Sequence, residues 1–254
     1  MSKPQPKPVA AKERPMFNGN PTNYRYTVTF AKHGPARFLG HLDLQTLFHR
    51  ALNRAKLPAA YSSGFNPHLL ISFAQPLPLG MTSYVELLDI EMDETAAPED
   101  IVKGLNASLP DGIEVLAAEL MPLGSKSMAS LMSGALYEIE FPESAALRNG
   151  FAEAVQWALG SDSIVIEKKS KRGTAQADIR PDICALKDIS DEKRIAAAAI
   201  LATGSYRNLK PEFVARLLCE RCGADFSPYT VRYARKKLYL NGLDGKIGDE
   251  SDIG

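Results

Sequence analysis

The chain has 254 residues, of which 45% are hydrophobic and 24% are charged. These values are ordinary for globular proteins and exclude a fully disordered or fibrous chain. Lys plus Arg and Asp plus Glu each number 30, which excludes a uniformly basic nucleic-acid binder but not a locally basic face. The three cysteines cannot form a disulfide framework and are typical of a reducing compartment.

Segments 1–23 and 241–254 lack hydrophobic periodicity, and we expect both to be flexible tails. Segment 1–15 has no apolar core of a signal peptide, and the longest apolar run, 195–202, is far shorter than the roughly 20 residues that span a bilayer. The sequence therefore predicts a cytoplasmic protein without membrane contact. A Ser-, Gly- and Met-rich linker is expected at 122–134, between folded regions 24–121 and 135–240.

Apolar periodicity predicts an alternation of strands and helices in the first region. The expected elements are strand 24–31, helix 41–56, strand 69–74, strand 84–92, helix 98–108 and strand 113–120.

The second region shows a similar order. The expected elements are strand 136–141, helix 143–159, strand 163–169, a polar stretch, 195–202, helix 211–222 and strand 229–240. The run of four consecutive alanines at 196–199 leaves the segment 195–202 open between a strand and a buried helix. We therefore expect an α+β protein made of two tandem ferredoxin-like βαββαβ units.

Four sequence blocks stand out, at Lys32–Asp43, Tyr61–His68, Ser72–Gly80 and Lys171–Pro181. In this order they closely resemble a bacterial family of unknown function whose members are fused to, or encoded beside, radical-SAM proteins. The resemblance covers most of the folded chain and implies an accessory partner of a radical-SAM enzyme. It supplies no reaction, and it assigns no role to His49.

Cofactor chemistry finds little support in the residues themselves. Cys219 and Cys222 form one C-x-x-C pair, and Cys184 lies 35 residues away, so the chain lacks the three clustered thiolates of a radical-SAM iron–sulfur cluster. The pair closes a predicted helix, whereas a dipole-activated thiol would open one. We expect structural cysteines, no metal site and no cofactor.

All four histidines fall between residues 33 and 68. His41 and His68 could meet through the fold, where they would hydrogen-bond the loop backbone, contact a ligand or act in acid–base catalysis. The segment 61–68 has turn chemistry, and its Phe65 could stack on a base or plug the core. Arg37 could bind phosphate or pair with Asp43.

Basic residues gather at two places. The first group surrounds Gly173 and is expected on an exposed hairpin or loop, and the second is interleaved with tyrosines in the last strand. Such patterns suit RNA backbone binding with base stacking, although lysines at a sheet edge also prevent aggregation. Asp178 and Arg180 alternate, so they are expected to share a strand face. The basic residues are Lys168, Lys169, Lys171, Arg172 and Arg180, then Arg232, Arg235, Lys236 and Lys237.

These features favour a non-catalytic module that binds RNA, either tRNA or ribosomal RNA, and presents it to a radical-SAM enzyme. No DNA binding is expected. One alternative is an RNA-cleaving enzyme, with His41 and His68 as the weak catalytic candidates. Another is a pure protein adaptor that docks through 75–81 and the methionines of the linker. The candidate ligand or RNA contacts are Arg37, His41, Asp43, Ser62, Gly64, Phe65, Asn66, His68, Lys171, Arg172, Asp178 and Arg180.

Overall fold

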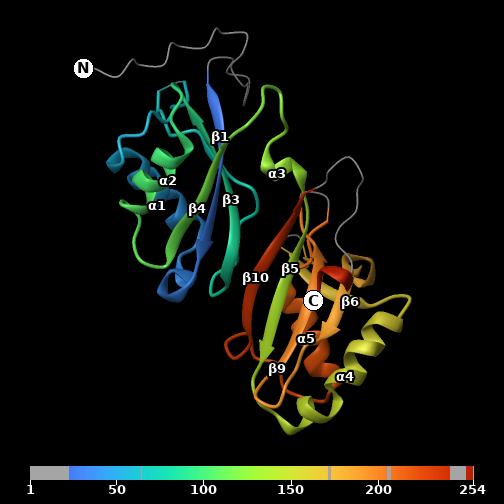
Figure 1. Cartoon of the computed structure of the whole chain (residues 1–254). Coiled ribbons are helices and arrows are strands. Elements are labelled where there is room, and N and C mark those ends of the chain that lie inside the picture. Colours follow the sequence, from blue (N-terminus) through green and yellow to red (C-terminus); the bar gives the residue numbers. More distant parts are fainter. Residues whose placement is uncertain (1–22, 64, 171–172, 205–206, 241–249, 254) are drawn as a thin grey trace, which may run out of the picture. The chain divides into compact units, whose positions relative to one another are not determined.

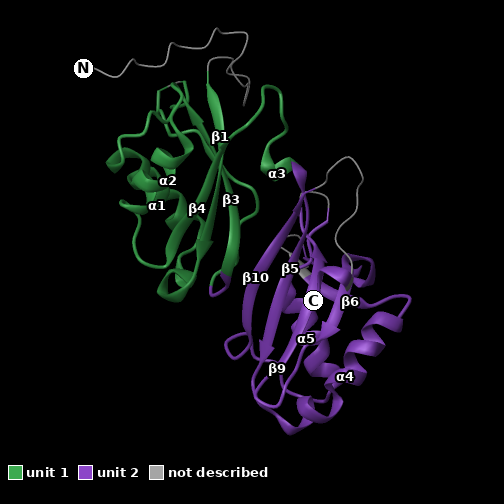
Figure 2. Ribbon diagram, in the orientation of Figure 1, with its two compact units in different colours: residues 1–79, 83–130 green, residues 80–82, 131–254 purple. Residues whose placement is uncertain are grey.

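A computed structural model describes residues 23–63, 65–170, 173–204, 207–240 and 250–253 (Figure 1). The chain divides into two compact units (Figure 2). Unit 1 comprises Met1–Leu79 and Ser83–Ser130, and unit 2 comprises Gly80–Thr82 and Leu131–Gly254. The fold is α+β, with antiparallel strand pairs and helices in each unit. Among the described residues, no helix is long and apolar enough to cross a membrane.

Unit 1 has the predicted order of strands and helices. Its elements are β1 (Tyr24–Lys32), η2 (Gly34–Phe38), α1 (His41–Arg54), β2 (Ile71–Phe73), β3 (Thr82–Met92), α2 (Pro98–Asn106) and β4 (Ile113–Leu120). The strands pair in the order β4-β1-β3-β2, and every one of these pairs is antiparallel.

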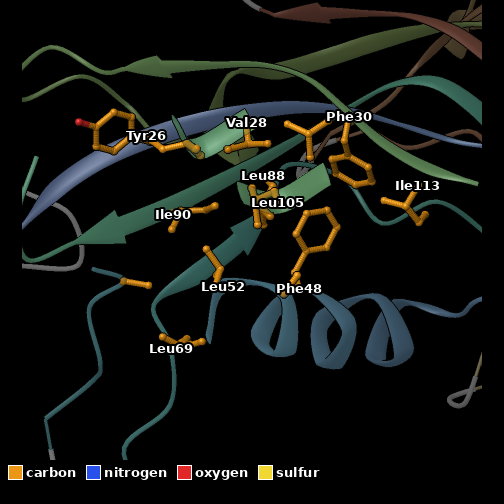
Figure 3. Packing of buried hydrophobic residues seen from close by; sticks show 14 of the residues in the cluster. Tyr26, Val28, Phe30, Phe48, Leu52, Leu69, Leu88, Ile90, Leu105 and Ile113 are labelled. Atoms are coloured by element: carbon orange, nitrogen blue, oxygen red, sulfur yellow. The ribbon is translucent and has the colours of Figure 1, made fainter. Parts of the chain in front are cut away.

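The core of unit 1 lies between this sheet and its helices (Figure 3). Alternate β1 residues enter the core because side chains point to opposite faces along a strand. Val28 and Phe30 are fully buried there, beside Phe48 of α1 and Leu105 of α2. The apolar stripe that predicted α1 is therefore the face that packs on the sheet.

The segment 122–134, expected to be a loop-like linker, contains regular secondary structure in its second half. It contains α3 (Met128–Leu131), and β5 already begins at Met132. A buried carboxylate holds it to unit 1: Asp89 accepts hydrogen bonds from the Thr27 hydroxyl at 2.7 Å and from the Met128 backbone N–H at 2.9 Å. Arg25 donates to the Ser125 carbonyl at 2.7 Å. Polar side chains of the sheet, which periodicity cannot reveal, explain this order.

Unit 2 repeats the strand order with an insertion. Its elements are β5 (Met132–Phe141), α4 (Ala145–Gly160), β6 (Val165–Ser170), β7 (Gly173–Asp178), η3 (Arg180–Asp182), β8 (Ile183–Asp188), β9 (Ile195–Ala202), α5 (Pro211–Arg221), β10 (Arg232–Leu240) and η4 (Glu250–Asp252). The main strands pair in the order β10-β5-β9-β8, while β6 and β7 form a separate two-stranded sheet.

In unit 2 the structure decides one open alternative and changes two expectations. The segment 195–202, left open between a strand and a buried helix, is a strand, β9, and is buried at every position. The expected strand 163–169 does not join the main sheet but pairs with β7 in a hairpin. The place beside β9 is taken by β8, from the stretch expected to be merely polar. Of the expected tails, 1–22, 241–249 and Gly254 lie outside the described residues, while Ile253 is buried.

Candidate nucleic-acid interface

The loop between Tyr61 and Leu69 is closed at its neck by Ser62 and His68. The Ser62 N–H donates to the His68 carbonyl at 2.8 Å, and the His68 N–H donates to the Ser62 hydroxyl at 3.1 Å. The same hydroxyl lies 2.8 Å from His68 Nδ1. At the tip Phe65 is fully exposed, so it does not plug the core. Its ring is available for stacking.

Two other candidate residues, Gly64 and Asn66, belong to the same loop. Asn66 is exposed, and Gly64 lies outside the described residues. At the neck, Ser62 and His68 are hydrogen-bonded to each other, so they shape the loop. The loop therefore presents Phe65 and Asn66 from a closed backbone.

His41 and His49 have different surroundings on α1. The exposed His41 ring lies edge-on to Phe73, with ring centroids 5.3 Å apart. On α1, it is His49 that lies close enough to His68 to be influenced by its charge. Burial first, and the charge of His68 second, lower the pKa of His49. Its Nε2 atom is buried and accepts or donates no hydrogen bond within the described residues.

Acid will therefore weaken unit 1 through His49. A lowered folded pKa means that the unfolded chain binds more protons near its own pKa of about 6.5, so this stability is present above that pH and is lost as the pH falls through it. Urea unfolding followed by circular dichroism between about pH 8 and about pH 5.5 should show a flatter pH profile for His49→Gln. The exposed His33→Gln is the control. Equal slopes in both variants would contradict this assignment.

Arg37 and Asp43 do not pair within the described residues. Asp43 instead accepts a hydrogen bond from the Gly40 backbone N–H at 2.9 Å and so caps the start of α1. The Arg37 guanidinium carbon lies 4.7 Å from the centroid of the Phe38 ring, which is 60% exposed. Arg37 thus remains a cation on an exposed aromatic ring, a combination that suits a nucleic-acid contact.

The β6–β7 hairpin carries the first basic cluster. Lys168 pairs with Ala175, Lys169 with Thr174 and Ser170 with Gly173. Most of β7 is exposed. Lys168 Nζ lies 5.6 Å from the centroid of the Phe213 ring of α5. Lys171 and Arg172, which connect the two strands in the sequence, lie outside the described residues.

The base of this hairpin is fixed by the two residues expected to share a strand face. Asp178 ends β7, but Arg180 begins η3, so that expectation is wrong. Asp178 Oδ1 accepts hydrogen bonds from the Ile164 N–H at 2.8 Å and from the Arg180 N–H at 3.0 Å, and these two contacts lower the pKa of Asp178. Arg180 donates from its guanidinium to three backbone carbonyls, those of Leu159, Ser161 and Ile183. Both side chains therefore position the hairpin.

The second basic cluster is largely neutralised by neighbouring groups. Arg232 Nη1 lies 3.2 Å from Glu140 Oε1, and Lys236 Nζ lies 3.4 Å from Glu138 Oε2. Arg235 is buried and donates to the Tyr137 hydroxyl. Tyr233 and Tyr239 are also buried, which leaves Tyr229 as the exposed tyrosine of this segment. Exposed cations therefore remain on β10, each beside a carboxylate, whereas Tyr233 and Tyr239 are not available for stacking.

The cysteines carry no reactive signature. Cys219 is buried, and burial raises the pKa of its thiol to about 11. Burial also raises the pKa of Cys222, which follows the last residue of α5. Across the described parts of the chain, no three His, Cys, Asp or Glu side chains are grouped so that they could hold a metal ion.

The comparisons with known proteins concern the family. A family model described as "Uncharacterized protein conserved in bacteria (DUF2344)" matches residues 25–211. No curated protein matches the sequence. The crystal structure of an unknown protein from Galdieria sulphuraria aligns with 13% identity over 87% of this chain and 99% of that chain. The TM-score of this alignment is 0.25, which does not establish a shared fold.

Proposed function

This chain belongs to the DUF2344 family, and we propose that it is a non-catalytic accessory module that binds RNA for a radical-SAM enzyme. The observation that carries the RNA part is the exposed β6–β7 hairpin. Its sequence from 168 to 172 holds four cations and no acid. Asp178 and Arg180 fix its base, so the segment that carries these cations in the sequence is anchored at one end.

RNA binding has a physical rationale at this arm. Neutralising phosphates with Lys and Arg releases condensed counterions, which favours binding and makes it salt-dependent. The hairpin contains two acidic residues, Glu167 and Asp178. The carboxylate of Asp178 accepts hydrogen bonds from backbone N–H groups. The exposed Phe65 and the Arg37–Phe38 pair supply stacking groups on unit 1. Each surface is proposed for itself, with no assumption about how the units are arranged.

The strand order supports a finer proposal for the fold. Unit 1 has the element order βαββαβ and the strand order β4-β1-β3-β2. Without the β6–β7 hairpin, unit 2 has the same element order and the equivalent strand order β10-β5-β9-β8. We propose that both units are ferredoxin-like, with the hairpin as an insertion in the second.

Removing the cations of the hairpin should weaken RNA binding. We expect K169A/K171A/R172A to lose about ten-fold or more in affinity for a labelled single-stranded RNA, and its log–log salt slope to fall by about 2 for three lost phosphate contacts. Fluorescence anisotropy at several salt concentrations measures both quantities. The matched control is R232A/K236A/K237A, which removes the same charge from cations that are paired with acids.

Two outcomes would contradict the RNA proposal. Equal losses in the hairpin variant and in the control would indicate a net-charge effect, and binding without salt dependence would exclude phosphate neutralisation. RNA recovered intact supports a non-catalytic role, whereas cleavage that His41→Ala abolishes would favour the enzymatic alternative.

The radical-SAM partner needs a separate docking surface. Exposed large apolar side chains on a soluble surface commonly mark a protein contact. Phe38, Leu42 and Leu79 are 60%, 73% and 66% exposed, whereas Leu77, Met81 and Met128 are buried. We propose that Leu42 and Leu79 contact the partner, while the buried Met128 and Met132 do not. Co-purification of a radical-SAM protein with the unchanged chain, but not with Leu42→Asp, tests this contact.

A further inference from the structure

Strand β4 of unit 1 forms an end of its sheet, with β1 as its neighbour. Its sequence, IEVLAAEL, consists of apolar residues and two glutamates, without lysine or proline. Edge strands of natural proteins are commonly protected against pairing with other chains by lysine, by proline, by a bulge or by a covering element. The side chains of Leu116 and Leu120 are 48% and 42% exposed, so this edge is accessible from solvent.

The first half of the β4 edge is closed by a side chain of α2. The register with β1 shifts between Thr29 and Phe30, which places a bulge at Leu116. Before this bulge, Asn106 Nδ2 donates to the Val115 carbonyl at 2.8 Å, and the Val115 N–H donates to Asn106 Oδ1 at 2.8 Å. The amide thus binds both backbone groups, as a neighbouring strand would. A further strand can therefore pair only beyond the bulge.

The second half presents backbone groups that point away from the sheet. Successive residues of an antiparallel pair turn their N–H and C=O groups alternately toward the neighbouring strand and away from it. The Met121 N–H donates to the Arg25 carbonyl at 2.9 Å, so Met121 and Glu119 face β1, whereas Ala118 and Leu120 face away. Among the described residues, no strand or side chain binds the backbone of Ala118 or Leu120. We call this stretch the 118–120 edge.

Glu119 decides which residues the 118–120 edge can accept. Its side chain lies on the face opposite to those of Ala118 and Leu120, because side chains alternate along a strand. It is exposed and forms no ion pair within the described part of the chain. A strand that binds the backbone groups of both Ala118 and Leu120 places one residue directly opposite Glu119. An acid at that position would be destabilising, and a cation would be stabilising.

The same geometry disfavours a second copy of this chain as the occupant. Two antiparallel β4 strands that bind each other through these groups would pair Ala118 of each copy with Leu120 of the other. The Glu119 side chains of the two copies would then lie directly opposite each other and repel. RNA is also an unsuitable occupant, because its phosphates carry the same charge as Glu119. The complementary occupant is a basic segment of another protein.

We propose that the 118–120 edge binds an extended segment of a partner protein by strand addition. The segment carries Lys or Arg opposite Glu119, with an aliphatic residue on each side of this cation, because the flanking side chains lie on the same face as Ala118 and Leu120. Backbone hydrogen bonds supply affinity, and the alternate side chains supply specificity. The proposal goes beyond RNA binding and does not depend on it.

Two labelled peptides test the charge preference in the full chain. The first has a central Val-Lys-Val sequence flanked by threonines, and the second has Val-Glu-Val in the same frame. In fluorescence anisotropy the first should bind about ten-fold more tightly, and Glu119→Lys should reverse this preference. The matched control is Glu114→Lys, which makes the same charge change before the bulge and should keep the preference. Equal effects of both variants would overturn the proposal.

Ala118→Pro tests the backbone contacts. Proline removes an N–H that faces away from β1 and is tolerated at such edge positions, so the urea transition should not shift while the affinity for the Val-Lys-Val peptide is lost. Hydrogen exchange needs no variant: in the unchanged chain, this peptide should slow exchange of the Ala118 and Leu120 amides. Unchanged exchange at both amides would overturn the proposal. A dimer of the unchanged chain that Ala118→Pro dissociates in sedimentation would also overturn it, since a second copy would then occupy the edge.

Discussion

Replacing Phe48 by alanine should lower the free energy of unfolding of unit 1 by about 3–5 kcal/mol. Phe48 has no exposed surface, and its ring lies edge-on to Phe30 (Figure 3), with ring centroids 4.9 Å apart. It also lies edge-on to Phe73, with ring centroids 5.7 Å apart. The substitution removes the buried ring and leaves a cavity between α1 and the sheet. A loss of this size is a large fraction of the stability of an ordinary domain.

The chain offers a way to assign this loss to one unit. Its single tryptophan, Trp157, lies on α4 of unit 2, so its fluorescence reports on that unit. Circular dichroism reports on both units during urea unfolding. Phe48→Ala should shift the circular dichroism transition to lower urea and leave an unchanged tryptophan transition. The exposed Leu42→Ala is the control. A loss of less than about 1 kcal/mol in the free energy of unfolding would show that the packing of α1 contributes little to the core.

Strong periodicity made much of the fold predictable. The apolar stripe between Leu44 and Leu52 identified α1, and the alternation in 24–31 identified β1, because each pattern reflects one buried face. The segment 195–202 could not be assigned from its pattern, because a strand buried on both faces has no alternation. Alanine has a high helix propensity, so the run at 196–199 also suited a helix, and packing within the sheet overrides that propensity.

The errors in unit 2 have a different cause. β7, with the sequence GTAQAD, has little apolar content, and it is exposed because it lies outside the main sheet. β8 is short and has two exposed positions, so its pattern does not distinguish it from a loop. The position of 163–169 was therefore misjudged although its extended conformation was expected correctly. Sheet membership depends on long-range pairing, which local periodicity does not contain.

Candidate residues were harder to judge than elements, because a charged residue has the same appearance in sequence whether it binds a ligand or a carbonyl. Arg232 and Lys236 meet glutamates on β5 that lie about 90 or more residues away in the chain. The resemblance assigns no role to His49, and the burial of its ring and its closeness to His68 arise only from the fold. The turn residues around Phe65 predicted a loop, but they left open whether Phe65 plugs the core, and its full exposure excludes that alternative.

Arg180 carries the other large expected effect, since Arg180→Ala should destabilise unit 2 by about 3 kcal/mol. Its guanidinium donates to the Leu159 carbonyl at 2.8 Å, to the Ser161 carbonyl at 3.1 Å and to the Ile183 carbonyl at 3.0 Å. Alanine would leave all three carbonyls without this donor, at the junction of α4, the hairpin and β8. Hydrogen bonds from charged donors each contribute about 1.5–3 kcal/mol to stability. In Arg180→Ala, water will hydrogen-bond the freed carbonyls and recover part of this stability.

The measurement separates an anchoring role from an RNA contact. The urea transition of Trp157 fluorescence should move to lower urea in Arg180→Ala, and amides of β6 and β7 should exchange faster with solvent. Lys169→Ala, in the hairpin itself, should leave the transition unchanged. Arg180→Lys should recover only part of the stability, because one ammonium cannot match the planar guanidinium that reaches three carbonyls. If Arg180→Ala kept its stability and lost only RNA affinity, Arg180 would be a ligand contact, and the anchor of the hairpin would have to lie elsewhere.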